Sequence, residues 1–143
     1  MSGPEDALKA TLRQWVEKAD NDLTTAALVL QLRAKCPTDT VCFHAEQCIE
    51  KYHKALLVMN LIDFPKTHDL NALARLKPKP LLSMLTDEER RRLTEYATVL
   101  RYPGDYEPIT LSEARAAVRT ARRVRREIRK LLPKAVLRRK RKR

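Results

Sequence analysis

The stretch DTVCFHAEQCIEKYHKALLVMNL, from Asp39 to Leu61, decides the fold of this chain. Its apolar residues recur three and four positions apart, which is the spacing of one face of an α-helix. The members of that face are Phe43, Ala45, Cys48, Ile49, Tyr52, Ala55, Leu56 and Met59. A face this wide must contact other elements on more than one side. We therefore expect a helix over 39–61, capped by Thr38 or Asp39, at the centre of a bundle or at a dimer interface.

Similar patterns occur on both sides of this segment. The expected helices cover approximately residues 5–33, 39–61, 68–76, 87–100 and 110–132. The expected caps are Thr67 for the third helix, Thr86 with Glu89 for the fourth, and Thr110 with Glu113 for the last. The segment 77–80, Lys-Pro-Lys-Pro, is expected to be a rigid connector. Because no segment favours strands, the sequence predicts an all-α fold, an antiparallel up-and-down bundle of four to five helices.

The positive charge of the chain is concentrated near its C-terminal end. Residues 110–143 hold 15 Lys and Arg against 2 Asp and Glu, a net of +13. Residues 1–109 hold 15 against 16, a net of −1, so the total is the formal +12. Since Pro133 ends the last helical pattern, we divide the chain into a bundle, residues 1–132, and a basic tail without regular structure, residues 133–143.

Such a density of cations favours contact with phosphate backbones, without base specificity and with strong salt dependence. The candidates for this polyanion contact are Arg122, Arg126, Arg138, Arg139, Lys140 and Arg141. Aromatic side chains that could stack on bases are absent from this end of the sequence. The alternative is a tail that improves solubility or contacts an acidic partner.

Several classes of protein lack support in the sequence. The N-terminus does not resemble a signal peptide and no apolar run is long enough to span a membrane, so we expect a cytoplasmic protein. The cysteines at 36, 42 and 48 do not converge on one side of a helix, and we expect no metal site. With two glycines in the chain, glycine-rich phosphate loops are excluded, and no cofactor is expected.

Four motifs occur in a fixed order along the chain. They are Trp15 with Ala19-Asp20-Asn21-Asp22-Leu23, residues 42–57, Pro65-Lys66-Thr67-His68-Asp69-Leu70, and Leu100-Arg101-Tyr102-Pro103. This series resembles the HEPN family of prokaryotic helical domains over about residues 10–132. The resemblance implies a dimeric bundle and a partner, because such proteins are commonly encoded beside a minimal nucleotidyltransferase as a toxin–antitoxin pair. It also implies either metal-independent ribonuclease activity or binding of nucleotides and other polyanions.

The catalytic signature of the family is an arginine followed, after four to six residues, by a histidine. Arg101 lies where that arginine is expected, but positions 106–108 are Tyr106, Glu107 and Pro108. The full motif is therefore absent, and a tyrosine with an ordinary pKa near 10 is a poor base at neutral pH. A ribonuclease that used Arg101 with Tyr106 or Glu107 remains an alternative to a module that only binds.

A polar stripe could line a cleft together with Arg101. His44, Gln47, Lys51 and Lys54 are three or four residues apart and share one face of the expected helix. The candidate ligand-binding residues are accordingly Arg101, Tyr102, Asp105, His44, Gln47, Lys51 and Lys54. The alternative for the stripe is a solvated face with its own charge pairs. Three functions are thus open: a nucleotide- or RNA-binding interaction module, a ribonuclease toxin, and a purely structural partner subunit.

Overall fold

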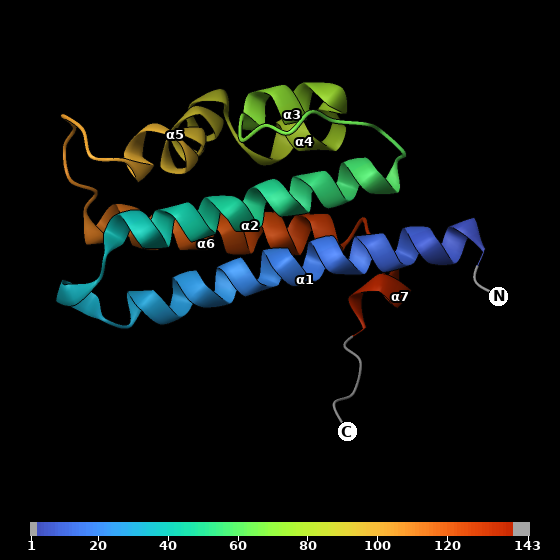
Figure 1. The fold of residues 1–143 in the computed structure, drawn as a ribbon, viewed down its shortest axis with the longest axis horizontal. Coiled ribbons are helices and arrows are strands. Elements are labelled where there is room, and N and C mark those ends of the chain that lie inside the picture. The colour runs from blue at the N-terminus through green and yellow to red at the C-terminus, as the bar shows by residue number, and fades with distance from the viewer. Residues whose placement is uncertain (1–2, 139–143) are drawn as a thin grey trace.

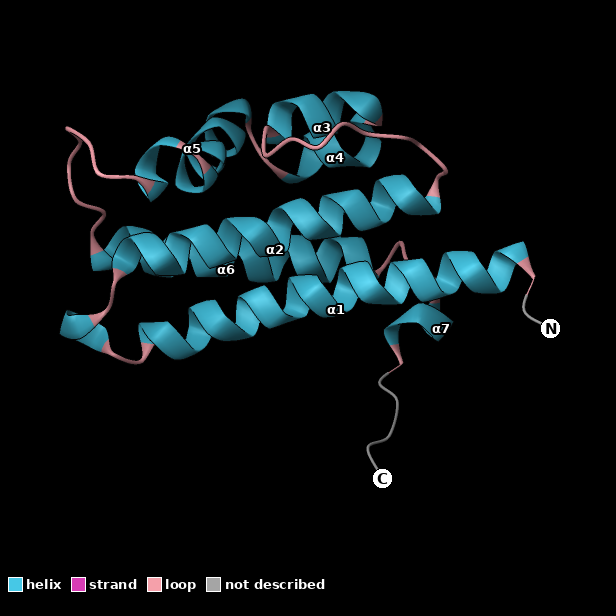
Figure 2. Cartoon of the chain, in the orientation of Figure 1, coloured by secondary structure: helices cyan, strands magenta, loops and turns pink. Residues whose placement is uncertain are grey.

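Helix α2 (Thr38–Met59) lies at the centre of the molecule in the computed structural model, which describes residues 3–138 (Figure 1). Helix α1 (Pro4–Leu30) and helix α6 (Leu111–Arg129) pack along it, and the shorter helices lie on its remaining side. Those are α3 (Leu70–Leu76), α4 (Pro78–Met84) and α5 (Asp87–Ala97). The all-α prediction is confirmed, since the described residues contain no strand (Figure 2).

The three long helices and α5 alternate in direction along the chain, so that α2 runs against α1, α5 against α2, and α6 against α5 (Figure 1). Two short 3-10 helices, Arg33–Lys35 and Val99–Arg101, follow α1 and α5. None of the helices in the described range 3–138 has the length and apolar character needed to cross a lipid bilayer.

The wide apolar face of α2 is confirmed by burial. Six of its eight predicted members are fully or almost fully buried, while Phe43 and Met59 are half-buried. The residues that meet this face are mostly Leu and Ala from α1, α3 and α5, together with Val118, Val124 and Ile128 of α6. The face is wide because α2 has neighbours on almost every side.

The start of α2 differs from its prediction. Thr38 is the first helical residue, and its hydroxyl makes no cap but donates to the Ile109 carbonyl at 2.7 Å. This bond attaches the start of α2 to the segment before α6. The third helix is capped by Asp69, whose carboxylate accepts from the Asn71 and Ala72 amides, and not by Thr67.

The capping box before α5 is confirmed in both directions. Thr86 Oγ1 accepts from the Glu89 amide, and Glu89 Oε1 accepts from the Thr86 amide, each at 3.0 Å. Before α6 only half of the expected box forms. Thr110 accepts from the Glu113 amide, but the Glu113 carboxylate instead accepts from Arg92 and Tyr96 of α5. A tertiary contact has replaced the local one.

Two helices were not predicted, which is why the bundle has more helices than the expected four or five. Helix α4 begins within the presumed rigid connector, because proline suits the first turn of a helix. Helix α7 (Lys134–Leu137) lies inside the segment expected to lack regular structure. Buried Val136 anchors it against the bundle, and Arg13 of α1 donates to the Ala135 carbonyl at 3.2 Å.

Candidate functional site

Arg101 lies at the end of the 3-10 helix that follows α5, and its side chain is exposed. Its guanidinium carbon is 4.4 Å from the centroid of the Phe43 ring on α2. Within residues 3–138 no carboxylate lies within 4.0 Å of it. A guanidinium stacked on a ring keeps its in-plane N–H donors available, and these match the oxygens of a phosphate.

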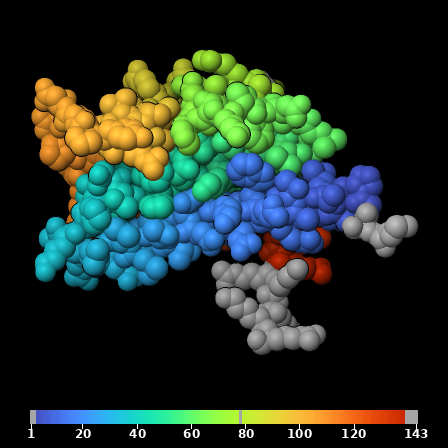
Figure 3. Space-filling model, viewed as in Figure 1, coloured from blue at the N-terminus to red at the C-terminus, as the bar shows by residue number. Residues whose placement is uncertain are grey.

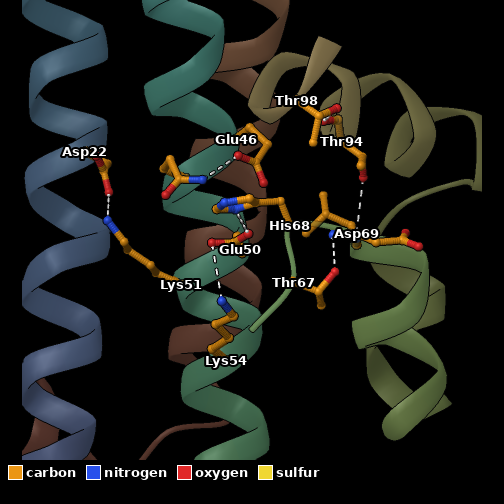
Figure 4. A network of polar contacts seen from close by, with 12 residues as sticks. Asp22, Glu46, Glu50, Lys51, Lys54, Thr67, His68, Asp69, Thr94 and Thr98 are labelled. Atoms are coloured by element: carbon orange, nitrogen blue, oxygen red, sulfur yellow. Dashed lines mark hydrogen bonds and ion pairs between the residues drawn. The ribbon is translucent and has the colours of Figure 1, made fainter. Parts of the chain in front are cut away.

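A second polar group lies beyond the same ring. The edge of Phe43 meets the imidazole of His44, with the ring centroids 5.3 Å apart. His44 Nδ1 is 2.9 Å from Asp22 Oδ1 on α1. The other oxygen of that carboxylate, Asp22 Oδ2, accepts from Lys51 Nζ at 2.5 Å (Figure 4). The fold therefore links three predicted site residues, Arg101, His44 and Lys51, through Phe43 and Asp22.

The sequence did not assign Phe43 and Asp22 to the site. Phe43 was counted as part of the apolar face, and Asp22 was only part of a family-like motif. The pairing of Asp22 with α2 joins residues 22 and 29 positions apart, so no local pattern indicates it. The side of α2 that carries His44, Gln47, Lys51 and Lys54 is hereafter called the α2 polar face; its His44 and Lys51 are partly exposed, whereas Gln47 and Lys54 are buried.

Lys54 has a different environment from Lys51. Its ammonium lies 3.5 Å from Glu50 Oε2, and it faces the contacting rings of Trp15 and Phe64 at 5.8 and 5.6 Å from their centroids. Glu50 Oε1 is 2.7 Å from Nδ1 of His68, which belongs to the segment before α3 (Figure 4). The Glu50 side chain is only 3% exposed, so one buried carboxylate holds both Lys54 and His68.

Gln47 is turned toward the protein interior. Its amide nitrogen donates to Glu46 Oε2 at 2.8 Å, and the other oxygen of that carboxylate has no hydrogen-bond partner within the described residues. Burial, reinforced by the nearby Glu50, raises the pKa of Glu46 well above its usual range. Glu46 is therefore neutral at pH values where an exposed glutamate is charged.

His53, about two turns beyond Glu46 along α2, is completely buried. Its Nδ1 lies 3.0 Å from the Ile49 carbonyl, and burial lowers its pKa to about 4. It is a neutral core residue at pH 7 and has no direct access to a ligand.

The turn after Arg101 is closed by Tyr106. The Tyr106 hydroxyl donates to the carbonyls of Tyr102 and Leu100. Gly104 permits this closure, because a Cβ there would come within 3.0 Å of the Tyr106 ring. The candidates Tyr102, Asp105 and Glu107 are exposed, and neither acid forms an ion pair within the described range.

The basic residues of α6 fall into two groups. Arg125 and Arg129 point toward Asp20 of α1, Arg123 donates to Glu89 at 3.2 Å, and Lys130 pairs with Glu127. The other group is exposed and consists of Arg115, Arg119, Arg122 and Arg126. Of the expected polyanion residues, Arg138 is exposed, whereas Arg139, Lys140 and Arg141 lie outside the described residues.

Two surface grooves lie away from Arg101. One, of about 260 Å³, lies between α5 and α6, where the Arg92–Glu113 pair and the Tyr96 hydroxyl meet. The other, of about 500 Å³, lies between α4 and α6. In the part of the chain that the structure describes, no three His, Cys, Asp or Glu side chains are placed to hold a metal ion.

Comparison with known proteins agrees with this architecture. The model of the HEPN domain family matches residues 12–131, which is most of the chain. No curated protein and no solved structure gives a significant match. The matched range contains Arg101, the α2 polar face and the whole of α6.

Proposed function

This chain belongs to the HEPN domain family, and on that premise we propose that it is a HEPN-type module that binds the phosphate of a nucleotide or of RNA and docks a partner protein. The observation that carries the proposal is the Arg101 guanidinium, exposed above Phe43 with no carboxylate partner in residues 3–138. The charge of such an arginine is not neutralised by an ion pair within the described fold and is available to a ligand. Bidentate contact with phosphate would use the donors that stacking leaves free.

His44 and Lys51 support the same site. Asp22 holds both side chains, so the imidazole is oriented before any ligand arrives. Because Nδ1 faces Asp22, the Nε2 edge of His44 is the one that can meet an anion or its hydroxyl groups. Tyr102 and Asp105 flank Arg101, where they would contact the ribose or base. Gln47 and Lys54 would act indirectly, since each is largely buried with a glutamate partner.

The partner in this proposal is a minimal nucleotidyltransferase, with which the chain would form a toxin–antitoxin pair, and the module itself would be a homodimer. Exposed apolar side chains beside the site support an interaction surface there. Val99 and Tyr102 are each 63% exposed and bracket Arg101 in sequence. Exposed apolar residues next to a binding group are typical of surfaces that contact other proteins.

The alternative of a ribonuclease needs a base beside Arg101. Tyr106 is poorly suited to that role, because its hydroxyl already donates to two carbonyls of its own turn. Glu107 is exposed, and no hydrogen bond or ion pair with another described residue orients it toward Arg101. These observations favour binding over cleavage by those residues.

The ligand is tested by thermal unfolding of the full chain with AMP, ATP or a 12-nucleotide RNA. A ligand at 100 times its Kd stabilises the folded state by about 2.7 kcal/mol, which is several degrees in melting temperature for a domain of this size. Arg101→Gln should abolish the shift. The matched control is Arg91→Gln, which removes another exposed arginine, from α5, and should leave the shift in melting temperature unchanged.

Two results would overturn the proposal. If none of the three ligands shifts the melting temperature of the wild type, the chain is better described as a purely structural partner. If the purified protein cleaves RNA without metal and Arg101→Gln abolishes the cleavage, binding alone is the wrong description. Light scattering gives the oligomeric state, and co-purification after co-expression with a minimal nucleotidyltransferase tests the partner.

A further inference from the structure

The four exposed arginines of α6 form a single line. Arg115, Arg119, Arg122 and Arg126 are separated by four, three and four residues, which places them on one side of the helix. We call this line the α6 arginine stripe. It covers residues 115–126, a rise of about 16 Å along an α-helix, with about one arginine per turn.

The stripe points away from the core of the bundle. The buried residues of α6 include Ala114, Ala117, Val118, Ala121, Val124 and Ile128, and they occupy the opposite side of the helix. Arg125 on one flank of the stripe contacts α1, and Arg123 on the other flank contacts Met84 and Glu89. The line between these flanks therefore faces solvent.

The charges of the stripe are not neutralised within the described structure. Arg115, Arg119 and Arg122 have no carboxylate within 4.0 Å among residues 3–138, and Arg126 has only a 3.9 Å contact with the exposed Glu127. The flanking Arg123 and Arg125, by contrast, each have a carboxylate partner at 2.8–3.2 Å. The four adjacent cations, three of them without a carboxylate partner among residues 3–138, repel one another, so an anionic partner would reduce this repulsion.

The chemistry of the stripe indicates what that partner is. All four residues are arginines, whose planar guanidinium matches phosphate oxygens in pairs. Helix α6 contains no aromatic residue, so bases have no side chain to stack on. The outward line itself also lacks the large apolar anchors that dominate protein interfaces. A regular row of arginines alone fits a regular row of phosphates.

We propose that the α6 arginine stripe is a contact surface for the phosphodiester backbone of a nucleic acid, separate from the Arg101 site and independent of base sequence. It rests on the proposed function only for the choice of RNA as a probe. The stripe adds Arg115 and Arg119 to the residues that charge density alone suggested. The paired arginines Arg125 and Arg129 do not belong to it, because Asp20 already holds them.

The salt dependence of binding tests this surface. The full chain would be titrated onto a fluorescent RNA duplex of about 16 base pairs and onto an oligo(U) strand of about 16 nucleotides, at NaCl concentrations from about 0.05 to about 0.3 M. The double variant Arg119→Gln/Arg122→Gln should reduce the slope of log K against log salt by about 1.8 for the duplex and about 1.4 for the single strand. The same relation gives about 60-fold weaker duplex binding at about 0.1 M salt.

The matched control is the double variant Arg75→Gln/Arg91→Gln. It removes the same charge from two exposed arginines on α3 and α5, neither of which forms an ion pair in residues 3–138. Its slope and affinity should equal those of the wild type. Since glutamine is a good helix former, the melting temperatures of both variants should stay close to that of the wild type, which separates loss of contact from loss of fold.

Two outcomes would overturn the inference. If both double variants weaken RNA binding equally, net charge and not the stripe determines affinity. If the stripe variant loses binding to poly-L-glutamate but keeps its RNA affinity, the stripe docks an acidic protein instead. The Arg101 proposal is judged separately, because the AMP-induced melting shift should disappear in Arg101→Gln and persist in Arg119→Gln/Arg122→Gln.

Discussion

The α2 polar face and the α6 arginine stripe carry cations at the same helical spacing but in opposite states. On α2, Lys51 and Lys54 each have a carboxylate partner, and both are at least half-buried. On α6, three arginines have no such partner within residues 3–138, and all four are exposed. The comparison teaches that spacing places charges on one face, whereas the neighbouring elements decide whether those charges remain available.

The difference follows from the positions of the two helices. Helix α2 is central, so α1 supplies Asp22 and the segment before α3 supplies His68 to its polar face. In the space-filling view, α2 is visible between α1 below it and the segment that follows α2 above it (Figure 3). Among residues 3–138, no element supplies a comparable set of partners to the outer side of α6. Paired cations stabilise the fold, and unpaired cations can bind a ligand.

The largest expected effect comes from removing the buried carboxylate. Glu50→Gln leaves the charge of Lys54 largely buried without its anion and releases His68. Breaking a buried pair in this way should lower the free energy of unfolding by about 3 kcal/mol, as measured by urea denaturation. Glu127→Gln, which removes the exposed partner of Arg126 and Lys130, should cost less than about 1 kcal/mol. If Glu50→Gln and Glu127→Gln lowered the free energy of unfolding equally, the carboxylate on α2 would not be more important to the fold than the one on α6.

The burial of His53 should make the free energy of unfolding depend on pH under acidic conditions. Its pKa is lowered to about 4 in the folded state, so between about pH 6.5 and 4 the unfolded chain binds the extra proton. The contribution of neutral His53 to the free energy of unfolding is therefore fully present above about pH 6.5. It is lost as the pH falls toward 4, which lowers the free energy of unfolding by about 3 kcal/mol. His53→Leu should show a correspondingly smaller loss of unfolding free energy over that range. A variant that follows the wild-type pH profile would contradict the assignment.

A smaller effect is expected at the link between α1 and α2. Asp22→Asn removes the charge that holds His44 and Lys51, and both groups can still reach water. The free energy of unfolding should fall by about 1–2 kcal/mol. Carbon and nitrogen chemical shifts of the His44 ring should also change, because its Nδ1 loses a carboxylate partner. A ring whose shifts stay constant would mean that Asp22 does not orient it.

The smallest effect is expected within α6 itself. Arg125→Gln removes a guanidinium that donates to Asp20 at 2.8 Å and should cost about 1 kcal/mol, since the pair is partly exposed. Arg122→Gln, three residues earlier, should change the free energy of unfolding by less than about 0.5 kcal/mol in either direction. If Arg122→Gln is the more costly of the two, the stripe has a structural partner after all.

The features that the sequence predicted well depend on local pattern. The apolar face of α2, the capping box of Thr86 and Glu89, and the end of regular helix near Arg101 follow from spacing and short-range bonding. In the same way, the line of arginines on α6 can be drawn from the sequence.

The features that the sequence missed depend on tertiary partners. Thr38 bonds to Ile109, 71 residues away, instead of capping its own helix, and Glu113 turns to Arg92 instead of completing its box. Helix α7 forms because Val136 finds a buried position on the bundle, which charge density in the tail could not indicate. For the candidate site, the sequence pattern predicts which cationic side chains share a helix face, but it does not predict which of them are neutralised by carboxylates from other elements.

The most direct test of this account is ¹⁵N NMR of the arginine side chains during titration with the RNA duplex. The account predicts that the Nε resonances of Arg101, Arg115, Arg119, Arg122 and Arg126 shift with added RNA, while those of Arg125 and Arg129 stay in place beside Asp20. Shifts at Arg125 and Arg129 equal to those of the stripe, or no shift at any of these arginines, would contradict the claim that unpaired cations bind phosphate and paired ones hold the fold.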